Sequence, residues 1–340
     1  MRFIACQKYN GWIFAWILLT LGFAVQAQEE TVTLPAAISP LIGSEFEYTA
    51  QRGDYLTRIG ARFGMEQRVL ARMNDLKWSA ALKPGQVLRI DNRHIVPKRQ
   101  EEGIIINLPQ RMLYFFRQGE LLLYYPVGLG RPDWQTPTGR FKVANLQENK
   151  TWYVPKSIQE EMRREGKAVL TEVPPGPENP LGKHWIGLNF DGYGIHGTIA
   201  PASIYHFQSH GCIRSHPDDI ARLFPQLSVG QPVNIIYAPV LLTRLEDGRI
   251  FLEVHRDVYK KGGDPLKTVQ DAAQSQGITG MMDWERVKEV IRKKEGLARE
   301  VGQPVNVMGI SKNSIKVRGQ GGNGRKSGVY TESAASRPRI

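Results

Sequence analysis

The chain has 340 residues, of which 41% are hydrophobic and 23% charged, an ordinary globular composition that excludes a fibrous or wholly disordered protein. This length predicts two or three domains rather than one small domain. The formal net charge is +12, and the two cysteines, Cys6 and Cys212, lie far apart in the sequence.

Residues 1–27 have the pattern of a secretory signal peptide. Basic residues, Arg2 among them, precede an apolar run from Trp12 to Val25, and small residues around Ala27 offer a cleavage site. The run is shorter than the ~20 residues that span a bilayer, which favours a cleaved signal over an anchor helix. We therefore expect the mature chain to be exported.

Export changes the meaning of the cysteines. Cys6 leaves with the signal peptide, so Cys212 is the one thiol of the expected mature chain. It has no partner for an intrachain disulfide, and an unpaired thiol in an oxidising compartment is exposed to oxidation. We therefore interpret Cys212 as a reactive residue.

The last segment, residues 309–340, is rich in Gly, Ser, Lys and Arg, which predicts a basic disordered tail. Residues 311–340 hold seven basic residues and one acidic residue. Nucleic acid is a poor partner for an exported protein. The charge is better matched by an anionic envelope surface, although a solvated tail without a partner is the preferred interpretation.

A short linker, residues 28–44, leads into a small module at residues 45–92. Alternating apolar residues from Phe46 predict a strand, Leu56 and Ile59 mark a helix face, and a second helix follows. The run after the turn at Pro84 predicts a closing strand. This strand-helix-helix-strand order predicts a small α+β (βααβ) fold.

The two ends of this module, GDYLTRIGARFG and LKPGQVLRI, resemble the LysM family. Tyr55 and Gly60 are mild departures, because Thr and Ala are common at these positions. The resemblance implies binding to a glycan that contains N-acetylglucosamine, here peptidoglycan. The alternative is a module kept only as a spacer.

Strand patterns dominate residues 102–238. The buried run GIIINL and a hairpin around Gln118-Gly119 come first, and TPTGRFKVANL then turns at residues 137–139 into another strand. A polar helix is predicted at residues 158–165, and the stretch HPDDIARLFPQL predicts a second helix. Together these patterns predict a mainly β domain with one or two helices.

Residues 239–308 are predicted to form a C-terminal extension. A strand pair turns at Asp247-Gly248 and two helices follow, the second with Trp284, Val287 and Ile291 on one face. No segment after the signal approaches the length of a membrane span.

The stretch FQSHGCIR around Cys212 holds residues that a cysteine nucleophile requires: a base, a group that orients it, and donors for the oxyanion. His196 ends a predicted strand sixteen residues earlier, so neighbouring strands would bring it against Cys212. His210 projects to the same face as Cys212 if the segment is extended. Gly197 and Gly211 permit close backbone approach, and N–H groups near Gly211 and Cys212 are candidates for an oxyanion pocket.

Two other interpretations of this stretch compete. One cysteine and several histidines can bind zinc, and zinc peptidases act on cell walls. However, no H-E-x-x-H or C-x-x-C spacing occurs, and no acidic residue lies between His196 and His216. A buried structural cysteine leaves the glycine-flanked polar residues unexplained. The chemistry of these residues favours a nucleophile and leaves both alternatives open.

The span IHGTIAPASIYHFQSHGCIR resembles the signature of the L,D-transpeptidase (YkuD) family, a His-Gly followed by Ser/Thr-His-Gly-Cys-x-Arg/Asn. TPTGRF and ENPLGKHWIGL are further matches. One departure is Tyr205-His206-Phe207, where a smaller, Gly-containing stretch is expected. The resemblance implies a mainly β catalytic domain, a YkuD-like β-sandwich of mixed sheets.

The resemblance also implies a role for each matched residue. Cys212 attacks the carbonyl of meso-diaminopimelate in a peptidoglycan tetrapeptide stem and expels the terminal D-alanine. His196 is the general base and acid, oriented by the backbone carbonyl of Gly197. The resemblance implies that His210 and Ser209 shape the substrate pocket and help to polarise the carbonyl. It implies that Arg214 holds a substrate carboxylate.

An amine then takes the acyl group. It belongs either to a second diaminopimelate, which gives a 3→3 cross-link, or to the C-terminal lysine of an outer-membrane lipoprotein. No metal or other cofactor is expected. A LysM module before this domain resembles the envelope enzymes of Gram-negative bacteria, which implies a periplasmic location. The alternative functions are a non-catalytic cell-wall-binding protein and a zinc-dependent murein peptidase.

Overall fold

The computed structural model describes residues 40–303. The predicted signal peptide, most of the linker and the basic tail lie outside the described residues. Within residues 40–303, no helix has the length and apolar character needed to cross a membrane.

The N-terminal module has the predicted strand-helix-helix-strand order: β2 (Glu45–Thr49), α1 (Leu56–Phe63), α2 (Gln67–Met73) and β3 (Val87–Asp91). β2 and β3 pair antiparallel. Leu56 and Ile59 are buried on the inner face of α1, as the apolar spacing predicts. A Cβ at Gly60 would lie 2.5 Å from the carbonyl oxygen of Met65, so this position has no room for the alanine that is common in the family.

Two short strands flank this module and pair with each other: β1 (Leu41–Ile42) and β4 (His94–Ile95). β1 leads into the small module, and β4 leads from it toward the large sheet.

The centre of the molecule is a nine-stranded mixed sheet within residues 103–236, with order β13-β7-β14-β12-β11-β8-β15-β5-β6. A further pairing of β6 with β7 closes the sheet on itself. The mainly β prediction is confirmed, and the structure adds this closure into a barrel-like ring. The strands are β5 (Gly103–Asn107), β6 (Met112–Arg117), β7 (Glu120–Gly130), β8 (Gly139–Glu148), β11 (His184–Leu188), β12 (Gly194–His196), β13 (Phe207–Ser209), β14 (Ile213–Ser215) and β15 (Pro232–Ile236).

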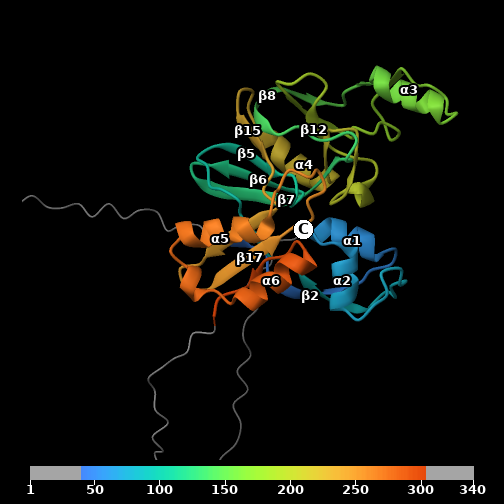
Figure 1. Cartoon of the computed structure of the whole chain (residues 1–340). Helices are drawn as coiled ribbons and strands as arrows, with labels where there is room; N and C mark the ends of the chain where they lie inside the picture. The colour runs from blue at the N-terminus through green and yellow to red at the C-terminus, as the bar shows by residue number, and fades with distance from the viewer. Residues whose placement is uncertain (1–39, 304–340) are drawn as a thin grey trace, which may run out of the picture.

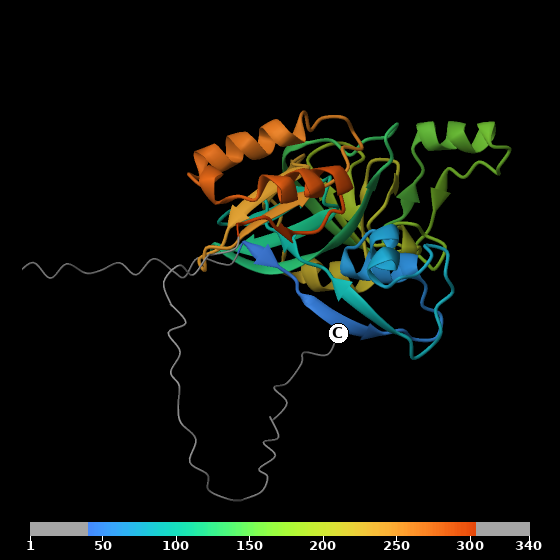
Figure 2. The same cartoon turned by 60° about the horizontal axis from the view of Figure 1, so that its bottom comes forward.

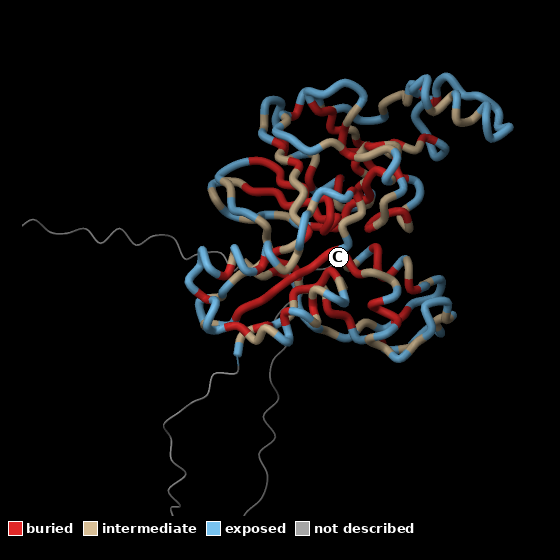
Figure 3. Tube along the Cα trace, viewed as in Figure 1, coloured by how far each residue is buried: buried red, intermediate tan, exposed pale blue. Residues whose placement is uncertain are grey.

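The interior of the ring is filled by aliphatic and aromatic side chains, among them Ile104, Phe115, Val127, Ile195 and Ile213. Figure 3 shows this buried centre and the exposed loops around it. Helix α4 (Pro217–Leu223) follows β14 and contributes Ile220 and Leu223 to the same core, and Phe224 of the 3-10 helix η2 (Phe224–Gln226) packs against it.

An insertion between β8 and β11 projects away from the ring in both views (Figure 1, Figure 2). It consists of β9 (Trp152–Tyr153), α3 (Lys156–Arg164) and β10 (Glu172–Val173), and β9 pairs with β10. No residue of α3 is buried. This helix therefore has no apolar core of its own and depends on polar contacts to hold its place.

The C-terminal extension has the predicted hairpin and helices: β16 (Val240–Arg244), β17 (Ile250–Val254), α5 (Pro265–Ser275) and α6 (Trp284–Lys293). The structure adds a 3-10 helix, η3 (Thr279–Met281), and a third strand, β18 (Arg299–Glu300), which pairs with β17. Both α-helices begin at aspartate caps, Asp264 and Asp283, whose carboxylates accept backbone N–H groups.

The small module and the extension lie side by side beneath the ring (Figure 1). Leu297 of the extension packs into the apolar cluster of the small module, and the buried carboxylate of Asp91 accepts from Arg299 at 2.6 Å. Helix α1 also lies against the 3-10 helix η1 (Pro201–Ser203) of the large sheet. All three parts therefore share contacts.

Candidate active site

His196 lies at the end of β12, which pairs in parallel with β14 so that His196 is opposite Arg214. The ring of Trp185 on β11 stacks against the imidazole, with centroids 5.9 Å apart. Nδ1 of His196 is 2.6 Å from the carbonyl oxygen of Gly197. That oxygen accepts only, so Nδ1 carries the proton and Nε2 is left as the acceptor. The contact implied by the family resemblance is therefore present.

His196 is neutral at ordinary pH. Burial and then the positive charge of Arg214 lower its pKa from 6.5 to about 4, although backbone contacts to Gly197 and Leu181 act in the opposite direction. A neutral imidazole with a free Nε2 can accept a proton, as a general base must.

Cys212 lies just before β14, and its thiol is the free cysteine of the described residues. The thiol donates to the carbonyl oxygen of Gly192 at 3.4 Å. Burial raises the pKa of Cys212, and the contact to Gly194 and the charge of Arg214 only partly offset this effect. The resting pair is therefore a neutral thiol and a neutral imidazole.

A tight turn precedes Cys212. Ser209 donates to the carbonyl oxygen of Cys212 at 2.5 Å, and the N–H of Gly211 donates to Ser209 Oγ at 3.2 Å. Gly211 has φ 104°, and a Cβ there would lie 2.8 Å from the ring of Tyr193, so only glycine fits.

Two features of this turn bear on the expected position of His210 and on the candidate oxyanion donors. The segment from His210 to Cys212 is not extended, because β13 ends at Ser209 and β14 begins at Ile213. The N–H of Gly211 is already used by Ser209, so it is not a free oxyanion donor in this structure.

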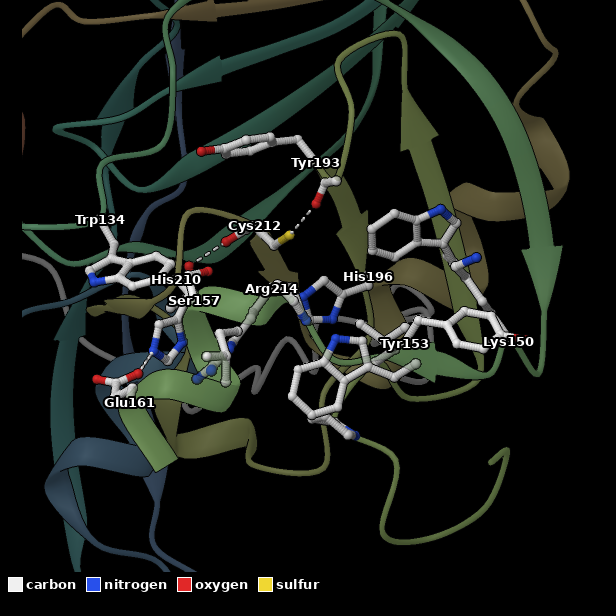
Figure 4. Close-up of a pocket in the computed structure, with 18 of the residues that line it drawn as sticks. Trp134, Lys150, Tyr153, Ser157, Glu161, Tyr193, His196, His210, Cys212 and Arg214 are labelled. Atoms are coloured by element: carbon white, nitrogen blue, oxygen red, sulfur yellow. Dashed lines mark hydrogen bonds and ion pairs between the residues drawn. The ribbon is translucent and has the colours of Figure 1, made fainter. Parts of the chain in front are cut away.

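These residues open into one cleft of about 840 Å³. His196, His210, Cys212 and Arg214 all line it, and Figure 4 shows their side chains turned toward this common space. Within the described residues, the side chain of Arg214 makes no hydrogen bond or ion pair, so its guanidinium is available to an anion.

The comparisons with known proteins agree with this geometry. Residues 101–235 match the L,D-transpeptidase catalytic domain (YkuD), and residues 48–91 match the LysM domain. The probable L,D-transpeptidase YcfS of Escherichia coli (strain K12) is 30% identical over 305 residues, covering 86% of this chain and 95% of that protein. The chain belongs to the L,D-transpeptidase family.

A second relative, the probable L,D-transpeptidase YbiS of the same strain, is 30% identical over 297 residues, covering 84% of this chain and 96% of that protein. The solved structure of an L,D-transpeptidase from Mycobacterium smegmatis aligns with a TM-score of 0.34 at 17% identity, covering 59% of this chain and 95% of that one. That score is too low to add to the argument. The predicted family is confirmed, and the chain is an L,D-transpeptidase enzyme with a LysM domain.

The structure adds residues to this L,D-transpeptidase site that the sequence did not reveal. Glu161 on α3 pairs with His210, and Arg131 binds the same carboxylate at 2.8 Å. The ring of Trp134 meets His210 edge to face, with centroids 4.8 Å apart. Glu161 lies 49 residues before His210 in the sequence, and no local spacing relates the two.

Thr136 is a second addition. Its hydroxyl donates to the carbonyl oxygen of Gly211 at 2.9 Å and accepts from the N–H of Gly130 at 3.0 Å. Tyr259 of the extension bonds the same loop, donating to Gly130 O at 2.5 Å. The sequence predicts a turn and a family match at the TPTG motif, and the structure adds that its first threonine anchors the turn before Cys212.

The remaining histidines of the signature region do not line the cleft that contains Cys212 and His196. His216 caps α4 by accepting from the N–H of Asp218 at 3.3 Å, which agrees with its predicted place at the helix start. His206 faces a separate, smaller cavity beside Glu66 and Arg111.

The described residues contain one group of three metal-ligating side chains, His94, Glu253 and His255, and it does not line the cleft. Glu253 Oε1 lies 2.8 Å from His94 and 2.7 Å from His255, which are hydrogen-bond distances. Two ligands of a tetrahedral zinc ion at its usual bond lengths lie about 3.3 Å apart. We therefore interpret this group as an ion-paired hydrogen-bond network, and it offers no ligand set to a zinc peptidase at Cys212.

Proposed function

We propose that this L,D-transpeptidase acts through a covalent acyl-enzyme on Cys212. The observation that carries the proposal is a thiol, a neutral imidazole with a free Nε2 and an unpaired guanidinium in one cleft. A nucleophile, its base and an anion-binding group are the parts that acyl transfer from a charged peptide requires.

The first step is acylation. The Cys212 proton passes to Nε2 of His196 as Sγ bonds to the substrate carbonyl carbon. The resulting tetrahedral intermediate collapses with loss of the amine, which leaves with the proton held by His196. The products are a thioester on Cys212 and a free amino acid, and His196 returns to its neutral form.

The second step transfers the acyl group. An acceptor amine attacks the thioester and gives a proton to His196, and Sγ departs and is reprotonated from the same ring. Proton transfer occurs during each attack, because both groups are neutral at rest. No step requires a metal or other cofactor.

The substrate we propose is the tetrapeptide stem of peptidoglycan, with D-alanine as the leaving group. Its free carboxylates match the unpaired Arg214, and the LysM domain is proposed to hold the glycan strand. The acceptor is either diaminopimelate of a second stem or a lipoprotein lysine. The location we propose for this reaction is the periplasm, which the predicted signal peptide supports.

A carbapenem tests the acyl-enzyme directly. We expect the intact mass of the protein to rise by one acyl adduct, localised to Cys212 by peptide mapping, and Cys212→Ala to abolish it. His196→Ala removes the base and should slow acylation far more than His206→Ala, which alters a histidine outside the cleft.

Other results favour the alternatives. An unchanged mass of the wild-type protein overturns the acyl-enzyme. Muropeptide capture without remodelling supports a binding protein, and activity lost to a chelator supports a zinc peptidase. Equal effects of His196→Ala and His206→Ala would refute the assignment of the base.

A further inference from the structure

The segment between His196 and β13 contains a strained residue. Tyr205 is fully buried and has φ 63°, a left-handed conformation that is costly for a bulky side chain. Its ring packs with Ile42, Met112 and Tyr114 at the junction of the small module and the sheet. Such a conformation persists only where surrounding contacts hold it.

Arg111, between β5 and β6, holds Tyr205 in two ways. Its guanidinium carbon lies 4.0 Å from the centroid of the Tyr205 ring, and its Nη1 donates to the Tyr205 carbonyl oxygen at 3.1 Å. A cation over an aromatic face and a charged donor on a buried carbonyl are both strong contacts in a dry environment. Arg111 therefore fixes the ring and the backbone of the strained residue together.

The charge of Arg111 is balanced by the LysM domain. Arg111 is 6% exposed, and its Nη1 bonds Oε1 of Glu66 at 2.7 Å. Glu66 lies directly before α2, within the LysM match. Burial opposes ionisation of Glu66, but the charge and hydrogen bond of Arg111 outweigh it and lower the pKa of the carboxyl. Removing Glu66 would leave a buried cation without its counter-charge.

Tyr205 is connected to the nucleophile by a short stretch of backbone. The backbone carbonyl oxygen of His206 accepts a hydrogen bond from the N–H of Leu129 at 2.9 Å. β13 then pairs with the end of β7. Ser209, the last residue of β13, bonds the carbonyl oxygen of Cys212. The position of the thiol is thus set by a strand whose entry is fixed at Tyr205.

We propose that Glu66 of the LysM domain is a positioning residue for the catalytic nucleophile, acting through Arg111 on the Tyr205 backbone. The LysM domain then helps to position Cys212 in the active site, and it is also a candidate glycan-binding module. This inference rests on the proposed acylation of Cys212, and it adds an interdomain contact on which the rate of that step depends.

The test compares the carbapenem acylation of the full chain with that of Glu66→Gln by stopped-flow and intact mass. We expect the limiting rate constant to fall about tenfold in Glu66→Gln, with one adduct per molecule still reached. A folding defect lowers the amount of adduct, because fewer molecules react. A misplaced nucleophile lowers the acylation rate constant, while the amount of adduct stays at one per molecule. Glu66→Asp keeps the charge and should lose only about threefold.

Glu295→Gln is the matched control. Glu295 also joins the LysM domain to the rest of the molecule, through Arg72 at 2.8 Å and Arg299 at 2.8 Å, but it does not touch Tyr205 or Arg111. We expect its rate constant to stay within about twofold of the wild type.

Four results overturn the inference. One is a wild-type rate in Glu66→Gln at full amplitude, and another is equal slowing in Glu295→Gln, which would show a general loosening of the domain contact. If Glu66→Gln does not fold, the inference is overturned by a wild-type acylation rate constant in both Glu66→Asp and Arg111→Lys. A wild-type protein that takes up no carbapenem overturns the acyl-enzyme itself, and this inference falls with it.

Discussion

His196 and Cys212 are held in their neutral forms by the same burial that shapes the cleft. A preformed thiolate would need a charged partner, and Arg214 offsets the burial of Cys212 only in part. In the proposed acylation, the thiol therefore stays protonated until a substrate carbonyl is in place, and a protonated thiol is less readily oxidised than a thiolate.

The pH dependence of acylation follows from this state. His196 must be neutral to accept the proton, so the rate constant should fall on the acid side with a midpoint near its lowered pKa of about 4. Carbapenem acylation measured across acidic pH, with adduct amplitude as the check on folding, gives this profile. A midpoint near about 6.5, the ordinary value of a histidine, would contradict the assignment.

Among the elements, the hairpins and the LysM domain were the most predictable. Their signals are local: Gln118 and Gly119 both have positive φ at the turn of β6 and β7, as a tight hairpin requires. The contacts of the insertion that carries α3 were less predictable. Its helix was expected from composition, but nothing local indicates that Glu161 reaches His210.

We expect a single substitution to weaken the attachment of helix α3 to the active-site region. Because none of its residues is buried, the contacts of Glu161 with Arg131 and His210 are its main attachment to the site. In Glu161→Gln we expect backbone amides of residues 156–164 to exchange about fivefold faster, with little change in global unfolding. Hydrogen-exchange mass spectrometry measures this, and Glu160→Gln, an exposed neighbour, is the control. Equal exchange in the two variants would contradict the attachment.

At the scale of the whole molecule, a buried charge cluster ties the three parts together. Both ring nitrogens of His94 lie at hydrogen-bond distance from oxygen atoms, Nδ1 at 2.8 Å from Glu253 Oε1 and Nε2 at 3.0 Å from the carbonyl oxygen of Gly64. Glu253 also accepts from Ile95 at 2.6 Å and from Gln110 at 3.0 Å. One carboxylate of the extension therefore joins the LysM domain to the large sheet.

This cluster predicts a loss of stability in acid. Burial alone would raise the pKa of Glu253, but the charge of His94 and its hydrogen bonds with both histidines lower it from 4.5 to about 2. A carboxyl with a lowered pKa stabilises the fold above its unfolded value and loses that contribution as pH falls toward about 2, here about 3 kcal/mol.

Urea unfolding at a series of pH values tests this contribution, with Glu253→Gln as the comparison. The wild type should be more stable than the variant above about pH 4.5, and the difference should shrink toward about pH 2. A difference that is constant across this range would mean that the Glu253 charge does not stabilise the junction.

The sequence by itself determined the Ser-His-Gly-Cys signature, with Cys212 as the one cysteine of residues 102–238, and the order of strands and helices in the LysM domain. These depend on composition, hydrophobic period and turn residues, which act over a few neighbours. Only the tertiary structure decided that the sheet closes on itself, that Glu161 faces His210 and that Glu66 of the LysM domain meets Arg111. Those contacts join residues far apart in the chain, and they form only when cross-strand pairing and domain packing bring separate segments together.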